Sequence, residues 1–345
     1  MSVLKDYLKR TKVVSVLRSH KWKHQSRISL FTEKELREIG SNPEKIHVAI
    51  SEKMEKFPDK GKILLEELEN VLSMAPMSRW GYTKEELKQD ILLEYFAYGF
   101  TFKEYACYQF ANKGNEERCK FLSDRDAAWV CYDINDLRDM HILADKSSTY
   151  EHFKEYYGRD LLIVSDQSDY RKFLAFIDKH RRIVKKNAFE SCGRSIELID
   201  IEKTECPVYD LFDKWISSGK TIIEELVPQS AALRRLNESS VNTLRCITIR
   251  FHNTINAQLF FMKAGRKGAF VDNGAAGGLL IAVNPITGVL GEATDEYGNR
   301  FMYHPDNGFK FGGFQLPDWG QAVDLCIEIA KNTKYQNDRV GFSSY

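Results

Sequence analysis

The sequence predicts an α+β protein, with helices in its first third and a largely antiparallel sheet region towards its C-terminus. Two observations predict this class. Between residues 32 and 110, apolar residues recur at helical spacing behind capping signals. From residue 242 onward, short apolar or alternating runs are separated by turn residues, which is the pattern of strands.

The composition indicates a globular protein of two or three domains or subdomains. Of its 345 residues, 43% are hydrophobic and 12% aromatic, enough for a sizeable core. Fifty basic against 49 acidic residues give a net charge of +1, which predicts no nucleic-acid partner. Seven scattered cysteines without a C-x-x-C pair suit reduced thiols. With no signal peptide and no apolar run near the roughly 20 residues of a membrane span, we expect a cytoplasmic protein.

The first 27 residues are strongly basic, with eight Lys or Arg residues against one acid, Asp6. Five apolar residues fall on one face of an expected helix: Val3, Leu4, Tyr7, Leu8 and Val14. A basic amphipathic helix can contact an anionic membrane peripherally, here at the inner face of the membrane. The alternative, which we favour, is a solvated helix docked on the body by its apolar stripe.

Capping boxes predict the first helices. Thr32 with Glu35, and Thr83 with Glu86, each precede apolar residues at helical spacing. The aromatic stretch 95–105 that follows is interpreted as core packing. These features predict a helical N-terminal region over residues 1–110.

Strands and helices alternate after Lys146. The expected strands are 161–164, 182–184, 196–201, 222–223, 244–251, 257–263 and 279–283. The expected helices are 170–180 and 319–330, and the expected turns are 252–253, 265–268 and 284–285.

Lys185 is a candidate for binding phosphate. It is expected directly after strand 182–184 and before a loop, 187–195, that contains small residues. An ammonium group there can lie over phosphates while main-chain N–H groups of the loop approach from the other side. Gly193 permits a close approach of the backbone. The alternatives are a solvated lysine leading into a hairpin, or Lys186 as the binding residue.

Glu224 and Glu225 follow the expected strand 222–223. Such a segment can present main-chain groups to the edge of an adenine and a carboxylate to its amino group. The alternative, which the sequence alone favours, is a strand end with solvated acids. Gln229, just beyond, can reach a ribose hydroxyl.

Arg245 and Asn273 are candidates for binding an anionic substrate. An arginine inside the apolar run 244–249 is costly unless it faces a site or an acid, and its guanidinium grips phosphate or carboxylate with two hydrogen bonds. Asn273 lies in the glycine-rich loop 272–278, and its amide both donates and accepts. A plain connection between strands is the alternative for this loop. The eight histidines show no metal-binding spacing, and the sequence leaves the residues that would bind a metal unknown.

The order of these segments resembles the sugar-transfer associated ATP-grasp family, predicted carboxylate–amine ligases of cell-surface polysaccharide biosynthesis. The segments are DK at 145, IVKK at 183, CGRS at 192, IIEEL at 222, SVNTLR at 240, DNGAAGG at 272, NPITG at 284 and HPDNG at 304. The resemblance runs from about residue 95 to 341. It implies an ATP-grasp fold of two α+β subdomains gripping ATP, with a pre-grasp segment and lid in 111–225 and the C-terminal subdomain in 226–345.

The resemblance also implies roles in binding ATP. Lys146 and Lys185 would be the two ATP-phosphate lysines, and the loop containing Gly193 would cover the phosphates. The segment from Glu224 to Leu226 would be the adenine hinge. Arg245 and Asn273 would face the transferred phosphate and an acyl-phosphate intermediate, which an amine then attacks. The sequence names neither the carboxylate nor the amine, sugar-linked or otherwise.

The sequence departs from the family at its C-terminal end. The family continues past Val-Gly-Trp-Asp into a strand bearing Glu-x-Asn, whose acids hold Mg²⁺. This chain reads VGFSSY over 340–345, with Ser343 at the position of the first acid. We therefore expect a subdomain truncated at its metal-binding end and a crippled Mg²⁺ site. Whether the chain is an enzyme stays open, and a nucleotide-binding pseudoenzyme or scaffold of a polysaccharide-assembly complex is the alternative.

Overall fold

The computed structural model describes residues 31–56, 58–75, 81–127, 130, 142–143, 145–188, 196–251, 254–332 and 341–344. These residues divide into two compact units. The helical unit contains the described residues up to 130 together with the segment 294–300, and the two-sheet unit contains the others. The basic segment 1–27 and the turn predicted at 252–253 lie outside the described residues.

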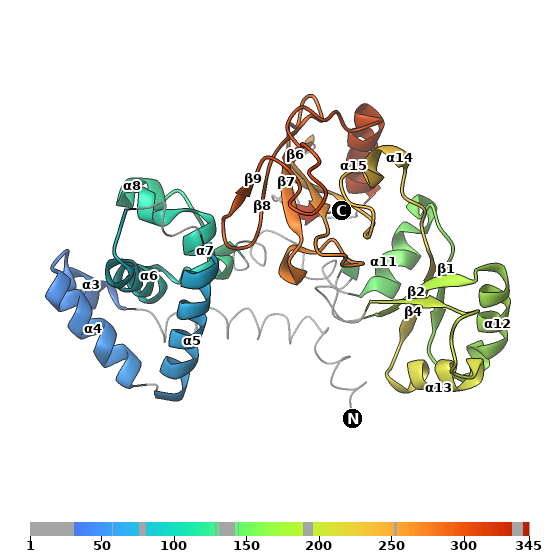
Figure 1. Cartoon of the computed structure of the whole chain (residues 1–345), viewed down its shortest axis with the longest axis horizontal. Coiled ribbons are helices and arrows are strands. Elements are labelled where there is room, and N and C mark those ends of the chain that lie inside the picture. Colours follow the sequence, from blue (N-terminus) through green and yellow to red (C-terminus); the bar gives the residue numbers. More distant parts are fainter. Residues whose placement is uncertain are drawn as a thin grey trace. The chain divides into compact units, whose positions relative to one another are not determined.

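The helical unit consists almost entirely of helices (Figure 1), and its core is rich in aromatic residues. Thr32 and Thr83 begin their helices with the predicted capping boxes, and Thr101 forms a third that the sequence analysis did not identify. Phe96, Phe100, Phe102 and Tyr105 are buried, as predicted for a stretch that packs in the core, whereas Tyr98 is half exposed. The helices are α3 (Glu33–Ile39), α4 (Pro43–Glu55), α5 (Pro58–Met74), α6 (Lys84–Tyr98), α7 (Phe102–Cys107), η2 (Phe110–Asn112) and α8 (Asn115–Arg118).

The segment 294–300 packs tightly within the helical unit. Gly298 has a φ of +77°, and a Cβ atom there would lie 2.6 Å from the main-chain oxygen of Ala106. The Asn299 amide donates to the Met74 carbonyl at 2.9 Å. Tyr297 packs against the aromatic core. A glycine at 298 is therefore required both by its dihedral angle and by the close approach.

The first sheet of the two-sheet unit has the order β1-β4-β2-β3, with antiparallel pairs. Its strands are β1 (Leu161–Val164), β2 (Arg182–Asn187), β3 (Glu197–Asp200) and β4 (Thr221–Glu225). Helices α12 (Tyr170–Lys179) and α13 (Val208–Ser217) supply Phe173, Phe212 and Trp215 to a core on one face of this sheet. The remaining helices here are α11 (Lys146–Phe153), η3 (Lys154–Tyr156) and η4 (Gln167–Asp169).

Two predicted strand ends in this sheet are wrong. Strand β2 continues to Asn187, so Lys185 lies inside the strand and not after it, opposite Ile223. Strand β4 includes Glu224 and Glu225, which both pair with β2. Pairing with neighbouring strands keeps these charged residues in extended conformation. Their side chains alone do not indicate that the strands continue this far.

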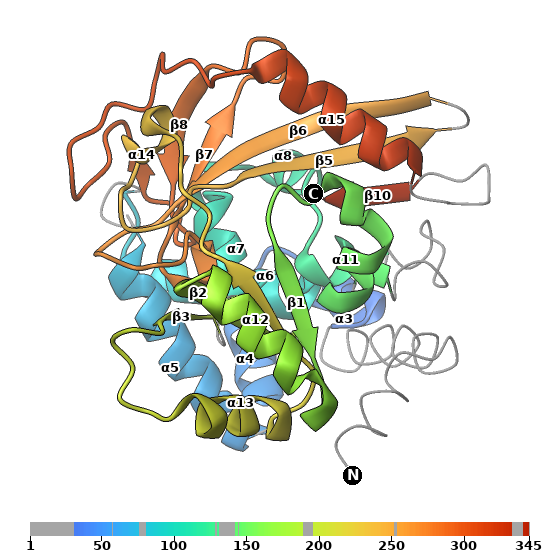
Figure 2. The same ribbon diagram turned by 90° about the vertical axis from the view of Figure 1, so that its right-hand side faces the viewer.

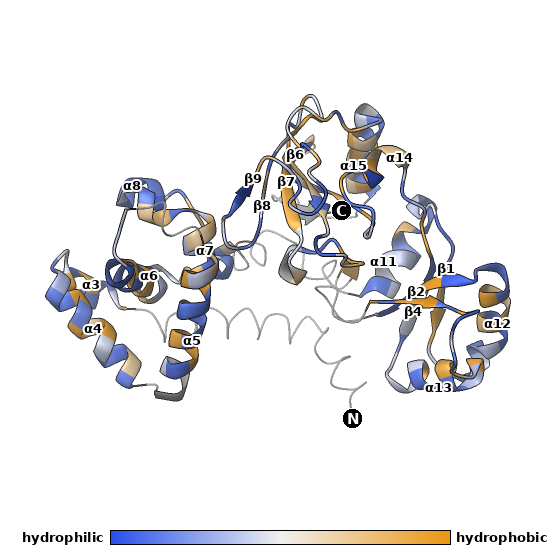
Figure 3. Cartoon of the chain, in the orientation of Figure 1, coloured by the Kyte–Doolittle hydropathy of each residue, from blue (hydrophilic) through white to orange (hydrophobic). Residues whose placement is uncertain are grey.

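The second sheet has the order β10-β5-β6-β7-β8-β9. Helix α15 (Trp319–Asn332) packs on β5 and β6 (Figure 2), with the ring of Trp319 edge-on to Phe260 at 4.7 Å. Strands β5 (Leu244–Phe251) and β7 (Leu279–Val283) have their predicted bounds. The other elements are α14 (Ala231–Arg234), β6 (Thr254–Ala264), η5 (Gly274–Ala276), β8 (Leu290–Thr294), β9 (Arg300–Phe301) and β10 (Gly341–Ser344). In Figure 3 the central strands β4 and β7 carry hydrophobic colours, whereas α12 and α13 are mixed, as expected of amphipathic helices.

Candidate functional site

A cavity of about 330 Å³ lies between the two sheets of the two-sheet unit. One wall comes from β2, β4 and the residues that follow β4. The other comes from the start of β5, the end of β6 and the loop 270–273. Its apolar surface includes Val184, Ile196, Leu226, Val227, Val241 and Phe270. An apolar slot with a few polar groups at its edge is the usual character of a small-molecule site.

Glu224 is buried in the wall of this cavity between two cations. Its Oε2 atom lies 2.7 Å from Nζ of Lys186 and accepts a hydrogen bond from Nε of Arg159 at 3.0 Å. Glu224 lies opposite Val184 in the ladder, so Lys186, two residues further along β2, lies on the same face. A carboxylate is stable at 7% exposure when it is paired in this way. Glu224 is therefore not the solvated acid of the alternative interpretation.

Glu225 also lines the cavity. As the last residue of β4, it contacts the residue before β1 and the residue after α12. Its Oε2 accepts from the main-chain N–H of Asp160 at 3.1 Å and lies 3.6 Å from Nε2 of His180. His180 in turn lies 2.7 Å from Oδ2 of Asp160, to which Lys179 also donates. These hydrogen bonds from Lys179 and His180 lower the pKa of Asp160.

The two adjacent lysines of β2 lie on opposite faces of the sheet. Lys186 lines the cavity, whereas Lys185 lies on the face that carries Ile183 and Ile223. Nζ of Lys185 is 2.9 Å from Oε1 of Glu197, its partner in the β2–β3 ladder. The structure therefore brings Lys186, the alternative to Lys185, next to Glu224. The phosphate role of Lys185 stays a prediction.

Lys146 is the first residue of α11, which begins at the N-cap Asp145. Its main-chain N–H donates to the Ala188 carbonyl at 3.1 Å, and its Nζ donates to the Asn187 carbonyl at 3.3 Å. Lys146 thus lies at the end of β2, where the predicted phosphate loop begins, and is not a lining residue of the cavity. Gly193 lies outside the described residues.

Gln229 is bonded to the buried residue Asn242. Its Oε1 accepts from the main-chain N–H and the side-chain amide of Asn242 at 3.1 and 2.8 Å, and its Nε2 donates to the Asn242 carbonyl at 3.1 Å. The Asn242 amide also donates to the carbonyls of Leu233 and Asn237. This network fixes the chain immediately before β5.

Arg245 is half-buried on the cavity side of the second sheet. Thr243 and Lys263 line the cavity, and Arg245 is two residues beyond Thr243 and opposite Phe261, so all share one face of the sheet. Arg245 itself does not line the cavity. Asn273 does line it and directly precedes η5, with its carbonyl accepting from the N–H groups of Ala276 and Gly278 at 3.0 Å each.

Two basic residues of the cavity, Arg159 and Lys263, had no signal in the sequence as site residues. They lie in no recognisable motif: Arg159 lies shortly before β1, and Lys263 lies near the end of β6. Asp272 was noted as the start of a glycine-rich loop. Its Oδ2 accepts from the main-chain N–H and the hydroxyl of Thr243, the former at 2.9 Å, and so ties the loop to the strand.

The carboxylates of the cavity do not fit a Mg²⁺ ion. Mg²⁺ takes oxygen ligands in near-octahedral geometry, using one or two carboxylates with phosphate oxygens and waters. Glu224 is held by two cations, Glu225 by a histidine and a main-chain N–H, and Asp272 by Thr243. The nearby Asp160, His180 and Glu225 have ligand atoms within 4.8 Å of one another, but a lysine already donates to the same aspartate. Among the described residues we therefore assign no Mg²⁺ ligand.

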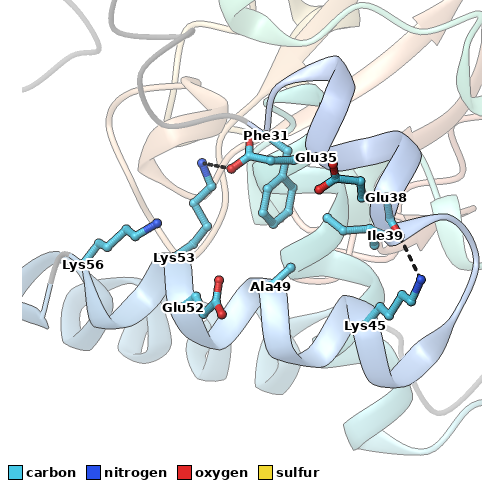
Figure 4. A pocket seen from close by; sticks show the side chains of 9 residues that line it. All are labelled: Phe31, Glu35, Glu38, Ile39, Lys45, Ala49, Glu52, Lys53 and Lys56. Carbon is cyan, nitrogen blue, oxygen red and sulfur yellow. Dashed lines mark hydrogen bonds and ion pairs between the residues drawn. The ribbon is translucent and has the colours of Figure 1, made fainter.

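A separate cavity, also of about 330 Å³, lies between α3 and α4 in the helical unit (Figure 4). Phe31, Ile39 and Ala49 form its apolar part, and Nζ of Lys53 lies 3.7 Å from Glu35 and 5.0 Å from the centre of the Phe31 ring. Three lysines and three glutamates line it, so its charge favours neither anions nor cations. The predicted site residues do not line it.

The fold and the cavity define the class of protein. Two antiparallel sheets with packed helices, which enclose a cavity between them, form the α+β architecture of an ATP-grasp protein. The family model for sugar-transfer associated ATP-grasp proteins matches residues 131–338, more than half of the chain. The chain belongs to this family, and the predicted fold class is confirmed.

Similar solved structures are distant. N5-carboxyaminoimidazole synthetase from Staphylococcus aureus is 11% identical, with a TM-score of 0.35 over 64% of this chain and 49% of that chain. D-alanyl-alanine synthetase A from Vibrio cholerae O1 biovar eltor str. N16961 is 7% identical, with a TM-score of 0.33 over 61% of this chain and 53% of that chain. The chain thus spans about half the length of these two structures, and no property of either is carried over to it. No curated protein matches the sequence significantly. In the described part of the chain, no helix has both the length and the apolar character of a membrane span.

Proposed function

We propose that the chain binds ATP in the cavity between its two sheets and is an ATP-dependent ligase that joins a carboxylate to an amine. The supporting observation is the cavity itself, which brings the segment 224–227 of one sheet to the loop 270–273 of the other. Its apolar walls suit the faces of an adenine ring. The Leu226 N–H donates to the Arg182 carbonyl at 3.3 Å, so the main chain of Val227, beyond the strand, is placed to meet the adenine edge.

Individual basic residues, and not the net charge of the cavity, support a phosphate-binding role, since three basic residues and three acidic residues line it. Lys186 and Lys263 line it, and Arg245 lies on the same sheet face as Lys263. We propose that Arg245 and Asn273 face the transferred phosphate and the acyl group, and that Lys146, next to the end of β2, and Lys185, within β2, contribute to phosphate binding. Fixed positive charge of this kind stabilises the charge that develops on a transferred phosphoryl group.

The proposed reaction has two steps. A carboxylate oxygen attacks the γ-phosphorus, the bond from that phosphorus to the bridging oxygen breaks, and ADP leaves with the electron pair. The amine nitrogen then attacks the acyl carbon of the acyl phosphate, the carbon–oxygen bond to phosphate breaks, and the nitrogen loses a proton to give an amide. The residues of the cavity align the reactants and exclude water, which favours the amine over hydrolysis.

Calorimetric titration of the full chain with a non-hydrolysable ATP analogue, with and without MgCl₂, tests this proposal. We expect saturable binding that Lys186→Ala weakens about tenfold or more, through loss of a charge-assisted hydrogen bond. Absence of saturable binding would refute the proposal. Binding that Mg²⁺ strengthens supports a ligase. Binding indifferent to Mg²⁺ supports the second candidate, a nucleotide-binding pseudoenzyme or scaffold, which the paired carboxylates of the cavity favour.

The cellular role that we propose is cell-surface polysaccharide biosynthesis in the cytoplasm, with peripheral membrane contact through residues 1–27. The supporting observations are the family and the excess of eight basic residues over one acid in that segment. Co-sedimentation with vesicles of anionic lipid tests the membrane contact. Deletion of residues 1–27 should abolish the salt-sensitive part of the binding, and equal binding of both chains would end this part of the proposal.

A further inference from the structure

The helical unit contains a second kind of site, a cavity of about 240 Å³ beside a buried carboxylate. Glu94 of α6 lines it and is 3% exposed. Its Oε1 accepts from Nη1 of Arg118 at 2.7 Å, and among the described residues its Oε2 has no hydrogen-bond partner. A buried carboxylate oxygen without a donor is unfavourable, so a donor entering the cavity would gain a strong hydrogen bond there.

The charged residues that line the cavity, taken together with Asp90, carry a net negative charge. Arg118 is shared with Asp90, to which its Nη1 and Nη2 donate at 2.9 and 2.7 Å. One guanidinium therefore serves two carboxylates, and Asp126 adds a further negative charge at the exposed edge of the cavity. Burial raises the pKa of Glu94 against the opposing effect of Arg118, which is the behaviour of an incompletely compensated carboxylate.

The remaining walls are aromatic. Tyr98, Phe100 and Phe121 line the cavity, and Asn115 adds an amide. Aromatic faces attract ammonium and guanidinium groups, and this unit already uses them so, with Arg118 5.6 Å from the centre of the Phe110 ring. Apolar faces of this kind are poor replacements for the oxygen ligands of a hydrated metal ion.

We propose that this cavity binds the ammonium group of a small organic amine, whose N–H groups donate to Glu94 while its carbon chain lies against the aromatic walls. A volume of about 240 Å³ is several times the ~30 Å³ that one water occupies in the liquid, so an amine of a few carbons fits. The lining residues are different from those of the cavity between the sheets. The inference therefore does not depend on the proposed function.

Calorimetric titration of the full chain with n-propylammonium chloride at constant ionic strength tests the proposal. Propan-1-ol and sodium propionate are matched neutral and anionic probes. We expect saturable binding of the ammonium, at least tenfold tighter than either probe. Equal binding of propan-1-ol would show an apolar cavity without charge preference and would overturn the proposal. Equal competition by potassium chloride would show an inorganic cation site and would overturn it as well.

Two variants locate the binding in this cavity. Glu94→Gln keeps the volume and the acceptor for Arg118 but removes the charge, and should weaken ammonium binding about tenfold. Tyr98→Ala, at a side chain that is half exposed, removes one wall and should weaken binding about two- to fivefold without touching the buried ion pairs. Glu44→Gln, on the exposed face of α4, is the control and should change nothing. Unchanged affinity in both cavity variants would place any binding elsewhere and refute the assignment.

Discussion

Replacement of Lys186 by Met tests whether Glu224 is held as a buried charge. The Glu224 side chain is 9% exposed, and its Oε2 is bound by Lys186 and by Arg159, whose side chain is 30% exposed. Removal of one partner from a buried ion pair costs about 3–5 kcal/mol. Because Arg159 remains as a second, partly solvated cation, we expect a smaller loss of about 2 kcal/mol in the free energy of unfolding of the two-sheet unit.

Scanning calorimetry can measure this loss. The transition of the two-sheet unit is the one whose Tm the ATP analogue raises, since a ligand stabilises the unit that binds it. A loss of about 2 kcal/mol corresponds to a decrease of about 4–8 °C for a unit of about 200 residues. Lys185→Met is the matched control. The Lys185 side chain is more buried than that of Lys186 (7% against 20% exposed), but its partner Glu197 is 52% exposed and can be solvated when the lysine is lost, so the decrease should be less than half as large.

The double variant Lys186→Met with Glu224→Gln completes the test. If the loss comes from an unpaired buried carboxylate, removal of its charge should restore most of the Tm. Equal decreases for the two lysine variants, or a double variant no more stable than Lys186→Met, would refute the argument that Lys186 neutralises Glu224.

Three further predictions follow from close contacts and pKa shifts. Gly298→Ala should lower the Tm of the helical unit by several degrees in calorimetry, because its Cβ would meet a main-chain oxygen at 2.6 Å. Gly40→Ala, at a residue with a positive φ but open space, should lower the Tm less. Equal decreases for the two variants would contradict the argument that the close contact at Gly298 causes the loss. Asp272→Asn, which weakens the hydrogen bonds to Thr243, should weaken ATP-analogue binding about three- to tenfold in the titration, and unchanged affinity would exclude a role of this tie in shaping the cavity. Glu94→Gln should gain stability relative to the unmodified chain as the pH rises. The folded-state pKa of Glu94 is raised, so its contribution is complete below the unfolded pKa and is lost as the pH rises through the folded pKa; urea unfolding over a pH series that shows a constant difference would contradict this.

The sequence predicted those elements whose signals are local. Strands β5 and β7 have their predicted bounds because their apolar residues are flanked by turn residues, and α3 and α6 begin at their capping boxes. Strand β2 is different. Ile183 and Val184 are both buried, so both faces of the strand are covered at this point and its apolar residues do not alternate. Alternation therefore could not indicate which of the two following lysines faces the cavity.

The polar residues of the candidate site were predictable in part. Glu224 to Leu226 and Asn273 line the cavity as a set, although they are about 50 residues apart, because the two sheets face each other there. What the sequence could not provide is the pairing. The local sequence alone favoured a solvated acid at Glu224, and only the family resemblance indicated a binding role, because its partners, Arg159 and Lys186, are 65 and 38 residues away along the chain. A buried charge becomes predictable when the partner that neutralises it is known, and that knowledge requires the register of the sheet.

Gln229, which we predicted to bind the nucleotide, positions a neighbouring segment through its hydrogen bonds to Asn242. Its Oε1 and one N–H of its Nε2 are used by Asn242, which leaves the second N–H of Nε2 as the donor that a ribose hydroxyl could meet without loss of these hydrogen bonds. The same bonds fix the chain directly before Thr243, which lines the cavity, and Arg245, which lies on the same face. We infer that Gln229 serves nucleotide binding mainly by holding the start of β5 through these three hydrogen bonds to Asn242.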